Sequence, residues 1–215
     1  MPRPSLQIQV PLGGLFRTTG GRDVIAQPPL GPESQVARAV GGLLEIPDSQ
    51  RLLAGLAALF GGASQYAITG STAIGLHRIY CGLQPHRSPA DLDLVVSAEG
   101  WANLQEVNEA TASTLGFHAI GTQRSGMTYR SSVEAAKTIA IDLIVAGKSP
   151  AGGGLENADS NHEGLNLVGT DVLLRNLALR KLASSPQSQK IELDTAALLE
   201  VSQHQQRGGS SSGGS

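Results

Sequence analysis

The stretch that decides the fold reads Asp91-Leu92-Asp93-Leu94-Val95-Val96 and predicts a strand with one apolar side. Successive side chains of a strand point to opposite faces, so the carboxylates of Asp91 and Asp93 lie together while the leucines point into the core. Two ionised carboxylates at this spacing repel each other unless a cation lies between them, and such oxygen ligands suit Mg²⁺ or Mn²⁺. An isolated Asp-Leu-Asp is more often a pair of solvated acids at a strand end, so the neighbouring stretches decide between the two interpretations.

A second strand, predicted over residues 138–146, supplies a third acid. Its apolar residues alternate to one face, which leaves Asp142 on the other; they are Ile139, Ile141, Leu143 and Val145. A lone carboxylate in so apolar a strand costs free energy unless it is paired or bound to a metal. Asp142 is therefore a candidate third ligand or general base, the alternative being an acid at the solvated rim of the sheet.

Upstream, residues 66–69 form a short apolar strand that runs into Gly70-Ser71, and a helix is predicted over residues 72–81. The free backbone N–H groups and the positive dipole end of a helix start suit the phosphates of a ligand. The hydroxyl of Ser71 adds a donor, although a serine at this point more often only caps its helix.

The remaining pattern alternates between helices and strands. Pro47-Asp48-Ser49 offers an N-cap to the first predicted helix, and residues 147–164, rich in Gly, Asn and Ser, are predicted to be a loop. The other predicted elements are helices at 50–60, 101–115, 172–184 and 190–203 and strands at 117–120 and 127–130. This order predicts an α+β fold: a mixed β-sheet with flanking helices and C-terminal helices.

A chain of 215 residues is long enough for one domain with a real core, which we expect over residues 35–205. Residues 1–34 carry most of the prolines and are predicted to be an irregular arm, with only a short strand-like alternation at 6–10. Residues 206–215, almost entirely Gly and Ser, are predicted to form a flexible tail.

Composition narrows the class of protein further. A net charge of -2 provides no global attraction to a nucleic-acid backbone, although a local basic patch is compatible with it. Cys81 is the only cysteine, which excludes an internal disulfide and a multi-cysteine zinc site and fits a reducing compartment. Since no apolar run reaches the length of a signal peptide or a membrane span, we expect a cytoplasmic protein without a membrane partner.

Taken together, these stretches resemble a known family. Gly-Ser-Thr-Ala at 70–73, a helical His77, Arg87-Ser88 and the Asp-Leu-Asp strand resemble the first motif of the DNA polymerase beta-like nucleotidyltransferase superfamily. The form looks most like its abortive-infection (AbiEii-like) toxins and their uncharacterised relatives. Asp171-Val172-Leu173-Leu174, Lys181-Leu182-Ala183 and the run at 190–199 resemble the family's C-terminal ending, so the likeness spans roughly residues 66–200.

The resemblance implies a nucleotidyltransferase fold and transfer of a nucleoside monophosphate from an NTP to a hydroxyl acceptor. It implies Mg²⁺ or Mn²⁺ held by the catalytic residues Asp91, Asp93 and Asp142. Gly70, Ser71, Arg87 and Lys181 would bind the triphosphate, and Asp194 would support the site. From the residues alone, Arg87 and Lys181 are as compatible with solvated surface cations, and His77 with a packed histidine.

The acceptor stays open among three interpretations. The first is an RNA such as a tRNA end, modified by a toxin that has an antitoxin partner. The second is a protein hydroxyl or an aminoglycoside-like antibiotic, and the third is a binding protein built on a decayed copy of the fold. Ile191 stands where the family often has an Asp, and the stretch between Ser71 and Asp91 is longer than in many relatives, which bears on the third interpretation.

Overall fold

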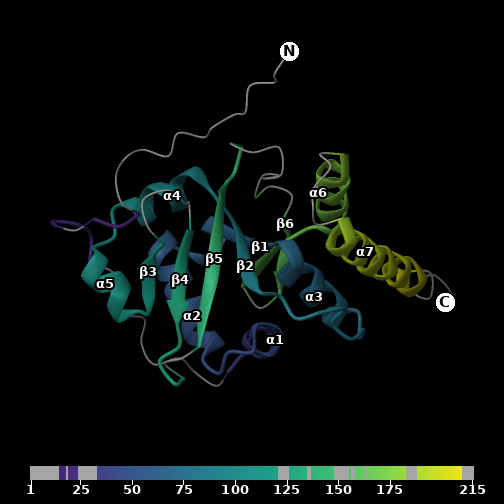
Figure 1. Cartoon of the computed structure of the whole chain (residues 1–215), viewed down its shortest axis with the longest axis horizontal. Coiled ribbons are helices and arrows are strands. Elements are labelled where there is room, and N and C mark those ends of the chain that lie inside the picture. The colour runs from purple at the N-terminus through teal and green to yellow at the C-terminus, as the bar shows by residue number, and fades with distance from the viewer. Residues whose placement is uncertain are drawn as a thin grey trace, which may run out of the picture.

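Seven strands form one mixed sheet, in the order β3-β4-β5-β2-β1-β7-β6 (Figure 1). The computed structural model describes residues 15–17, 19–23, 33–120, 126–134, 137–147, 155, 158–162, 164–182 and 188–209. The strands are β1 Tyr66–Thr69, β2 Asp91–Val96, β3 Phe117–Ala119, β4 Gly126–Arg130, β5 Thr138–Val145, β6 Ala158–His162 and β7 Leu165–Val168. The helices are α1 Gln35–Leu44, α2 Ser49–Phe60, η1 Ala63–Gln65, α3 Gly70–Tyr80, α4 Ala98–Gln105, α5 Glu109–Thr114, α6 Thr170–Leu182 and α7 Ser188–Gly209.

The sheet mixes parallel and antiparallel pairs around β2. This strand lies antiparallel to β1 and parallel to β5, while β4 lies antiparallel to both β5 and β3. Beyond β1, β7 is parallel to it and β6 closes the edge antiparallel to β7. The predicted α+β fold with a mixed sheet, flanking helices and C-terminal helices is therefore confirmed.

The core lies on one side of β2, β4 and β5. The alternation predicted for these strands is present, because Leu92, Leu94 and Ile141 are fully buried while Asp142 is exposed. Helix α2 lies behind β4 and β5 in Figure 1, and its Gly55 lies so close to the ring of Phe117 that an added Cβ would collide with it. The apolar side of the strands is thus closed by helices, and the acids are left on the other side.

One predicted helix is wrong in detail, and one helix was not predicted. The single helix expected at 101–115 is two helices, because Val107 and Asn108 form bridges to Arg22 and Arg17 of the N-terminal arm. Asn108 then caps α5, its side chain accepting a hydrogen bond from the backbone N of Ala110 at 2.9 Å. Helix α1 begins after Ser34, whose hydroxyl caps it, and was not predicted.

The loop expected at 147–164 contains a strand, β6, and β7 follows it directly. These short strands carry no long apolar alternation, and they are extended because β1 offers β7 a free edge. Helix α7 runs to Gly209, so the boundary expected at residue 206 falls inside it, while residues 210–215 and the alternation at 6–10 lie outside the described residues. In the described part of the chain no helix is both long and apolar enough to span a bilayer.

Asp48 is the N-cap of α2, at the predicted place, but its side chain makes no cap hydrogen bond. Its Oδ2 instead accepts hydrogen bonds from the Tyr129 hydroxyl at 2.8 Å and from the backbone N and hydroxyl of Ser132 at 2.8 and 2.9 Å. Partial burial by itself raises the pKa of Asp48, but these hydrogen bonds lower it overall. Asp48 therefore ties the start of α2 to the end of β4.

Asp48→Ala removes these hydrogen bonds and leaves the hydroxyl of the buried Tyr129 without its acceptor. We therefore expect the free energy of unfolding at neutral pH to fall by about 1–3 kcal/mol. The folded pKa of Asp48 lies below its unfolded value, so this contribution is present above the unfolded pKa and is lost as pH falls through the folded pKa. Urea unfolding at neutral pH and near pH 2.5 measures the difference between wild type and variant. A difference that does not narrow in acid would contradict the assignment.

Candidate active site

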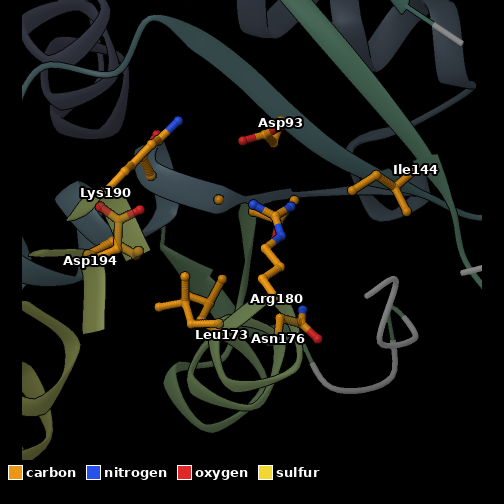
Figure 2. Close-up of a pocket in the computed structure, with 12 residues that line it drawn as sticks. Asp93, Ile144, Leu173, Asn176, Arg180, Lys190 and Asp194 are labelled. Atoms are coloured by element: carbon orange, nitrogen blue, oxygen red, sulfur yellow. The ribbon is translucent and has the colours of Figure 1, made fainter. Parts of the chain in front are cut away.

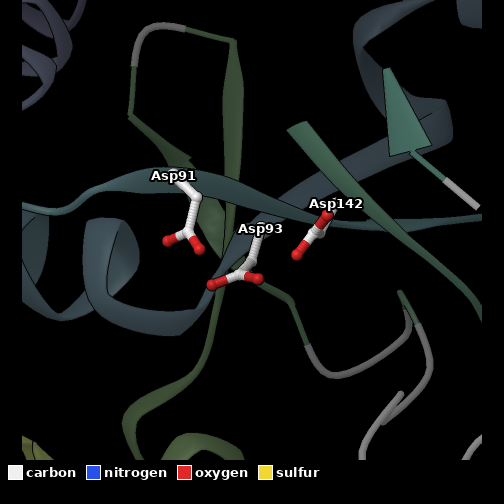
Figure 3. A group of neighbouring side chains, drawn as sticks. All are labelled: Asp91, Asp93 and Asp142. Atoms are coloured by element: carbon white, nitrogen blue, oxygen red, sulfur yellow. The ribbon is translucent and has the colours of Figure 1, made fainter. Parts of the chain in front are cut away.

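The three acids meet because the strand register brings them together. Asp93 lies opposite Asp142 in the parallel β2–β5 pair and opposite Thr69 in the antiparallel β1–β2 pair. Asp91 precedes Asp93 by two residues and therefore shares its face. One carboxylate oxygen from each acid lies within 4.8 Å of the others, and Figure 3 shows the three side chains on the same side of the strands. The convergence expected from the sequence is present.

Crowding changes the electrostatics of this cluster. Burial, followed by the charges of Asp91 and Asp142, raises the pKa of Asp93 to about 6, although Arg180 and Lys190 act in the opposite direction. Oδ1 of Asp91 is buried and has no hydrogen-bond partner among the described residues. An all-oxygen donor set with an unsatisfied carboxylate and mutual repulsion fits a hard divalent cation such as Mg²⁺ or Mn²⁺.

The turn between β1 and α3 lies directly against this cluster. Gly70 has a φ of +62°, and a Cβ at this position would overlap a carboxylate oxygen of Asp93. Only glycine combines this backbone conformation with so close an approach. The next residue, Ser71, is buried and its hydroxyl has no hydrogen-bond partner among the described residues. Thr69 is the N-cap of α3, so Ser71 is not the simple cap that is its more common role.

A pocket opens between this turn and the C-terminal helices. It is lined by Thr69, Gly70, Ser71, Ile74, Asp93, Ile144, Leu173, Asn176, Leu177, Arg180, Lys190 and Asp194. Figure 2 shows Arg180 of α6 and Lys190 of α7 directed toward the side of the pocket where Asp93 lies. The pocket therefore combines a helix start, one acid of the cluster and two cations, which is a suitable environment for a bound anion.

The structure separates the predicted site residues into two groups. It brings together Asp91, Asp93, Asp142, Gly70 and Ser71. Arg87 and Lys181 do not line the pocket: Arg87 donates two hydrogen bonds to Asp194, and the side chain of Lys181 is 66% exposed, with its Nζ 3.9 Å from Glu192.

Sequence reasoning missed Arg180 and Lys190, and helix phase is the signal that finds them. Arg180 follows Leu173 by seven positions and Leu177 by three, so it shares the face of α6 that faces the pocket, whereas Lys181 points away. Lys190 precedes Asp194 by four positions, which puts both on one face of α7.

Two other residues singled out in the sequence belong to the interior. Nε2 of the buried His77 lies 2.9 Å from the backbone oxygen of Val168, which confirms the packed-histidine interpretation. Ile191, at the position where the family often has an Asp, is 4% exposed and belongs to the hydrophobic core. This departure therefore alters the core rather than the acid cluster.

Comparisons with known proteins give only a distant likeness. No protein-family model and no curated protein matches the chain. Among solved structures it is similar to an antigenic nucleotidyltransferase-like protein from Paracoccidioides brasiliensis, with 16% identity and a TM-score of 0.42 over 63% of this chain and 67% of that one. It is also similar to ANT(2″)-Ia in complex with adenylyl-2″-tobramycin, with 17% identity and a TM-score of 0.36 over 63% of this chain and 87% of that one. Neither likeness is close enough to assign a function.

Gly70→Ala forces a Cβ into the Asp93 carboxylate, so we expect the affinity for Mn²⁺ to fall by about tenfold or more. Gly82→Ala is the matched control, because Gly82 also has a positive φ, of +73°, but open space around its Cβ position. Both variants lose roughly 1–2 kcal/mol from the backbone conformation. Mn²⁺ titration and thermal unfolding separate the two effects, and an equal loss of Mn²⁺ affinity in both variants would contradict the role of Gly70.

Asp93→Asn removes one of the repelling charges, so we expect the metal-free variant to be more stable than wild type. A folded pKa of about 6 against an ordinary 3.8 means that ionised Asp93 opposes folding increasingly as pH rises through this range, by up to roughly 3 kcal/mol above it. Urea unfolding in EDTA at pH 4 and pH 7.5 tests this, with the exposed Glu134→Gln as control. A variant less stable than wild type at pH 7.5, or a gain matched by Glu134→Gln, would contradict the repulsion.

Proposed function

We propose that this chain is a metal-dependent nucleotidyltransferase that moves a nucleoside monophosphate from an NTP to a hydroxyl acceptor. The observation that carries the proposal is the convergence of Asp91, Asp93 and Asp142 within 4.8 Å, beside a pocket formed by a glycine turn and two cations. Anionic substrates and a divalent cation together satisfy both the repelling acids and the cationic pocket. The sheet is held together by its strand pairing and its apolar side, and neither the three acids nor the two cations of the pocket belong to that apolar side.

Asp91, Asp93 and Asp142 would hold the metal. When bound, Mg²⁺ or Mn²⁺ supplies positive charge that neutralises the phosphates and stabilises the charge that develops during transfer. The donor set fits this ion because every ligand atom is a carboxylate oxygen and one of them, Oδ1 of Asp91, is buried without a hydrogen-bond partner among the described residues.

The triphosphate would bind on the α3 side of Asp93. Backbone N–H groups of the turn at Gly70 and the hydroxyl of Ser71 would donate to phosphate oxygens, since the start of α3 has no side-chain cap. Arg180 and Lys190 line the same pocket and would neutralise the remaining charge. We therefore assign to these two residues the phosphate contacts that the resemblance implies for Lys181 and Arg87.

The acceptor would approach from the opposite side, over β4 and β5. Asp142 is exposed there, and its neighbour across the strand pair is Gly126, which has no side chain to block the approach. In the proposed step the acceptor oxygen bonds to the α-phosphorus as the bond to the bridging oxygen breaks. Pyrophosphate leaves with that electron pair, and Asp142 accepts the proton of the hydroxyl.

For the acceptor we propose an RNA end, as in toxins of the abortive-infection type. The side of the sheet that carries Asp142 continues across β4 and β3 with the exposed basic side chains of Arg130 and His118. An exposed arginine and an imidazole beside small residues suit a polyanionic strand better than a cationic drug. An antitoxin would then be a further protein partner of the same cell.

The test is incubation of the protein with Mg²⁺ or Mn²⁺, each α-labelled NTP in turn, and total tRNA. We expect label on RNA in wild type and a loss of about a hundredfold or more in Asp93→Asn and Asp142→Asn, because both acids would hold the metal and Asp142 would also accept the proton of the hydroxyl. Lys137→Ala, at an exposed ion pair with Glu45, is the control and should transfer like wild type.

Parallel reactions with an aminoglycoside and with a cell lysate identify a different acceptor. Label on either, with none on RNA, would replace the RNA proposal and keep the transferase. Absence of label on every acceptor, together with absence of NTP binding, would contradict the proposed function and leave the decayed binding protein.

A further inference from the structure

Three basic side chains at the end of α3 and in the connector to β2 hold one side of α7. Nη1 of Arg78 donates to the backbone oxygen of Ala197 at 3.3 Å and to Glu200 at 2.6 Å. Nε2 of His86 lies 2.7 Å from Oδ1 of Asp194. Arg87 donates through Nε and Nη2 to the two oxygens of Asp194 at 2.9 and 3.0 Å. We name Arg78, His86 and Arg87 the α7 clamp.

The α7 clamp is built as one unit rather than as separate surface pairs. Nε of Arg78 donates to the backbone oxygen of Gln84 at 2.7 Å, so the residue that binds α7 also holds the connector. Asp194 is 5% exposed, which makes its ion pairs with His86 and Arg87 much better shielded from water than ordinary surface pairs. Arg78 is 8% exposed, while the side chain of its partner Glu200 is 51% exposed. Burial alone raises the pKa of Asp194, but the hydrogen bonds from His86 and Arg87 lower it to about 2, so the carboxylate is ionised at neutral pH.

Asp194 connects the α7 clamp to the pocket. It lines the pocket beside Lys190, which precedes it by one helical turn on the same face of α7 (Figure 2). Arg87 offers both ends of its guanidinium fork to Asp194, so its charge is directed at α7 and not into the pocket. Fixing Asp194 therefore fixes the position from which Lys190 reaches the pocket.

We infer that the α7 clamp positions Lys190 for the triphosphate, so that His86 and Arg87 are positioning residues for nucleotide binding. This inference rests on the proposed function. It separates two parts of the site: β2 and β5 hold the acids, whereas the α7 clamp holds one cation of the pocket. Loosening α7 should then weaken NTP binding without changing the acid cluster.

The test compares NTP and Mn²⁺ binding in variants of the full chain. We expect Lys190→Ala and Arg87→Ala each to weaken binding of the preferred NTP by about tenfold to a hundredfold, the range for loss of one charge-assisted contact. Because Arg87 acts through Lys190, the double variant should bind no more weakly than Lys190→Ala alone. For Arg87→Ala, the Mn²⁺ affinity measured without nucleotide should stay within about twofold of wild type, as for an undisturbed cluster.

Milder variants keep the test valid if Arg87→Ala unfolds. Arg87→Lys keeps the charge but cannot form the bidentate contact with Asp194, so it should still weaken NTP binding. His86→Gln can still donate to Asp194 and should restore binding that His86→Ala loses. Lys137→Ala, which breaks the exposed pair with Glu45, is the control for loss of a cation elsewhere.

Three outcomes would overturn the inference. The first is an Arg87 variant with lower thermal stability but unchanged NTP affinity, which means that the α7 clamp is structural only. The second is full additivity of the two substitutions, which means that Arg87 contacts the triphosphate itself. The third is absence of NTP binding by wild type, which contradicts the proposed function as well and is thereby distinguished from the other two.

Discussion

The repulsion among three carboxylates at one place on the sheet is the constraint on which the rest of the structure depends. Asp93 lies at the centre of the three acids: it is opposite Asp142 on β5, while on its other side it is opposite Thr69 on β1. Burial first, and then the charges of Asp91 and Asp142, raise the pKa of Asp93 to about 6, which corresponds to roughly 3 kcal/mol that folding has to offset. The apolar sides of the same strands provide the offset, because each fully buried leucine or isoleucine contributes about 1.5–3 kcal/mol. The core therefore holds the acids in an arrangement that they would not adopt by themselves.

The compensating charges come from elements far away in the sequence. Arg180 and Lys190 belong to the C-terminal helices, and they act on Asp93 in the direction opposite to its acidic neighbours. Helix α7 is in turn held through its residue Asp194. His86 and Arg87, in the connector that leads into β2, bind this carboxylate. The sheet and the C-terminal helices are thus linked twice, once through the pocket and once through the buried ion pairs behind it.

Strand periodicity was enough to predict the acid face, and the reason is physical. A period of two puts Asp91 and Asp93 on one face wherever the strand lies in the sheet, and the apolar alternation of β5 does the same for Asp142. That β2 and β5 pair in parallel is a long-range contact that no local pattern contains, so the convergence of all three acids needed the family resemblance as well. The strand β6 was missed for a similar reason, because its extended form depends on the edge offered by β7.

Helix phase explains why the basic residues were predicted less well than the acids. Adjacent residues on a helix point about 100° apart, so choosing Lys181 in place of Arg180 moves the charge from the pocket to solvent. The chosen position followed a family motif, whereas the periodicity of the buried residues of α6 points to its neighbour. Arg87 was a different case, since its partner Asp194 lies more than a hundred residues away and only the fold brings them together.

A merely structural copy of the fold does not explain the features that gather around Asp93. Gly70 takes a left-handed backbone conformation that lets it lie against the carboxylate, and the buried Ser71 hydroxyl and Asp91 Oδ1 have no hydrogen-bond partners among the described residues. The two unsatisfied atoms oppose folding when the site is empty, since an unsatisfied buried polar atom costs about 1–3 kcal/mol. A divalent cation and a phosphate chain would give both atoms a partner, whereas Ile191 lies in the hydrophobic core. The energetic cost is therefore concentrated at the positions where bound ligands would offset it.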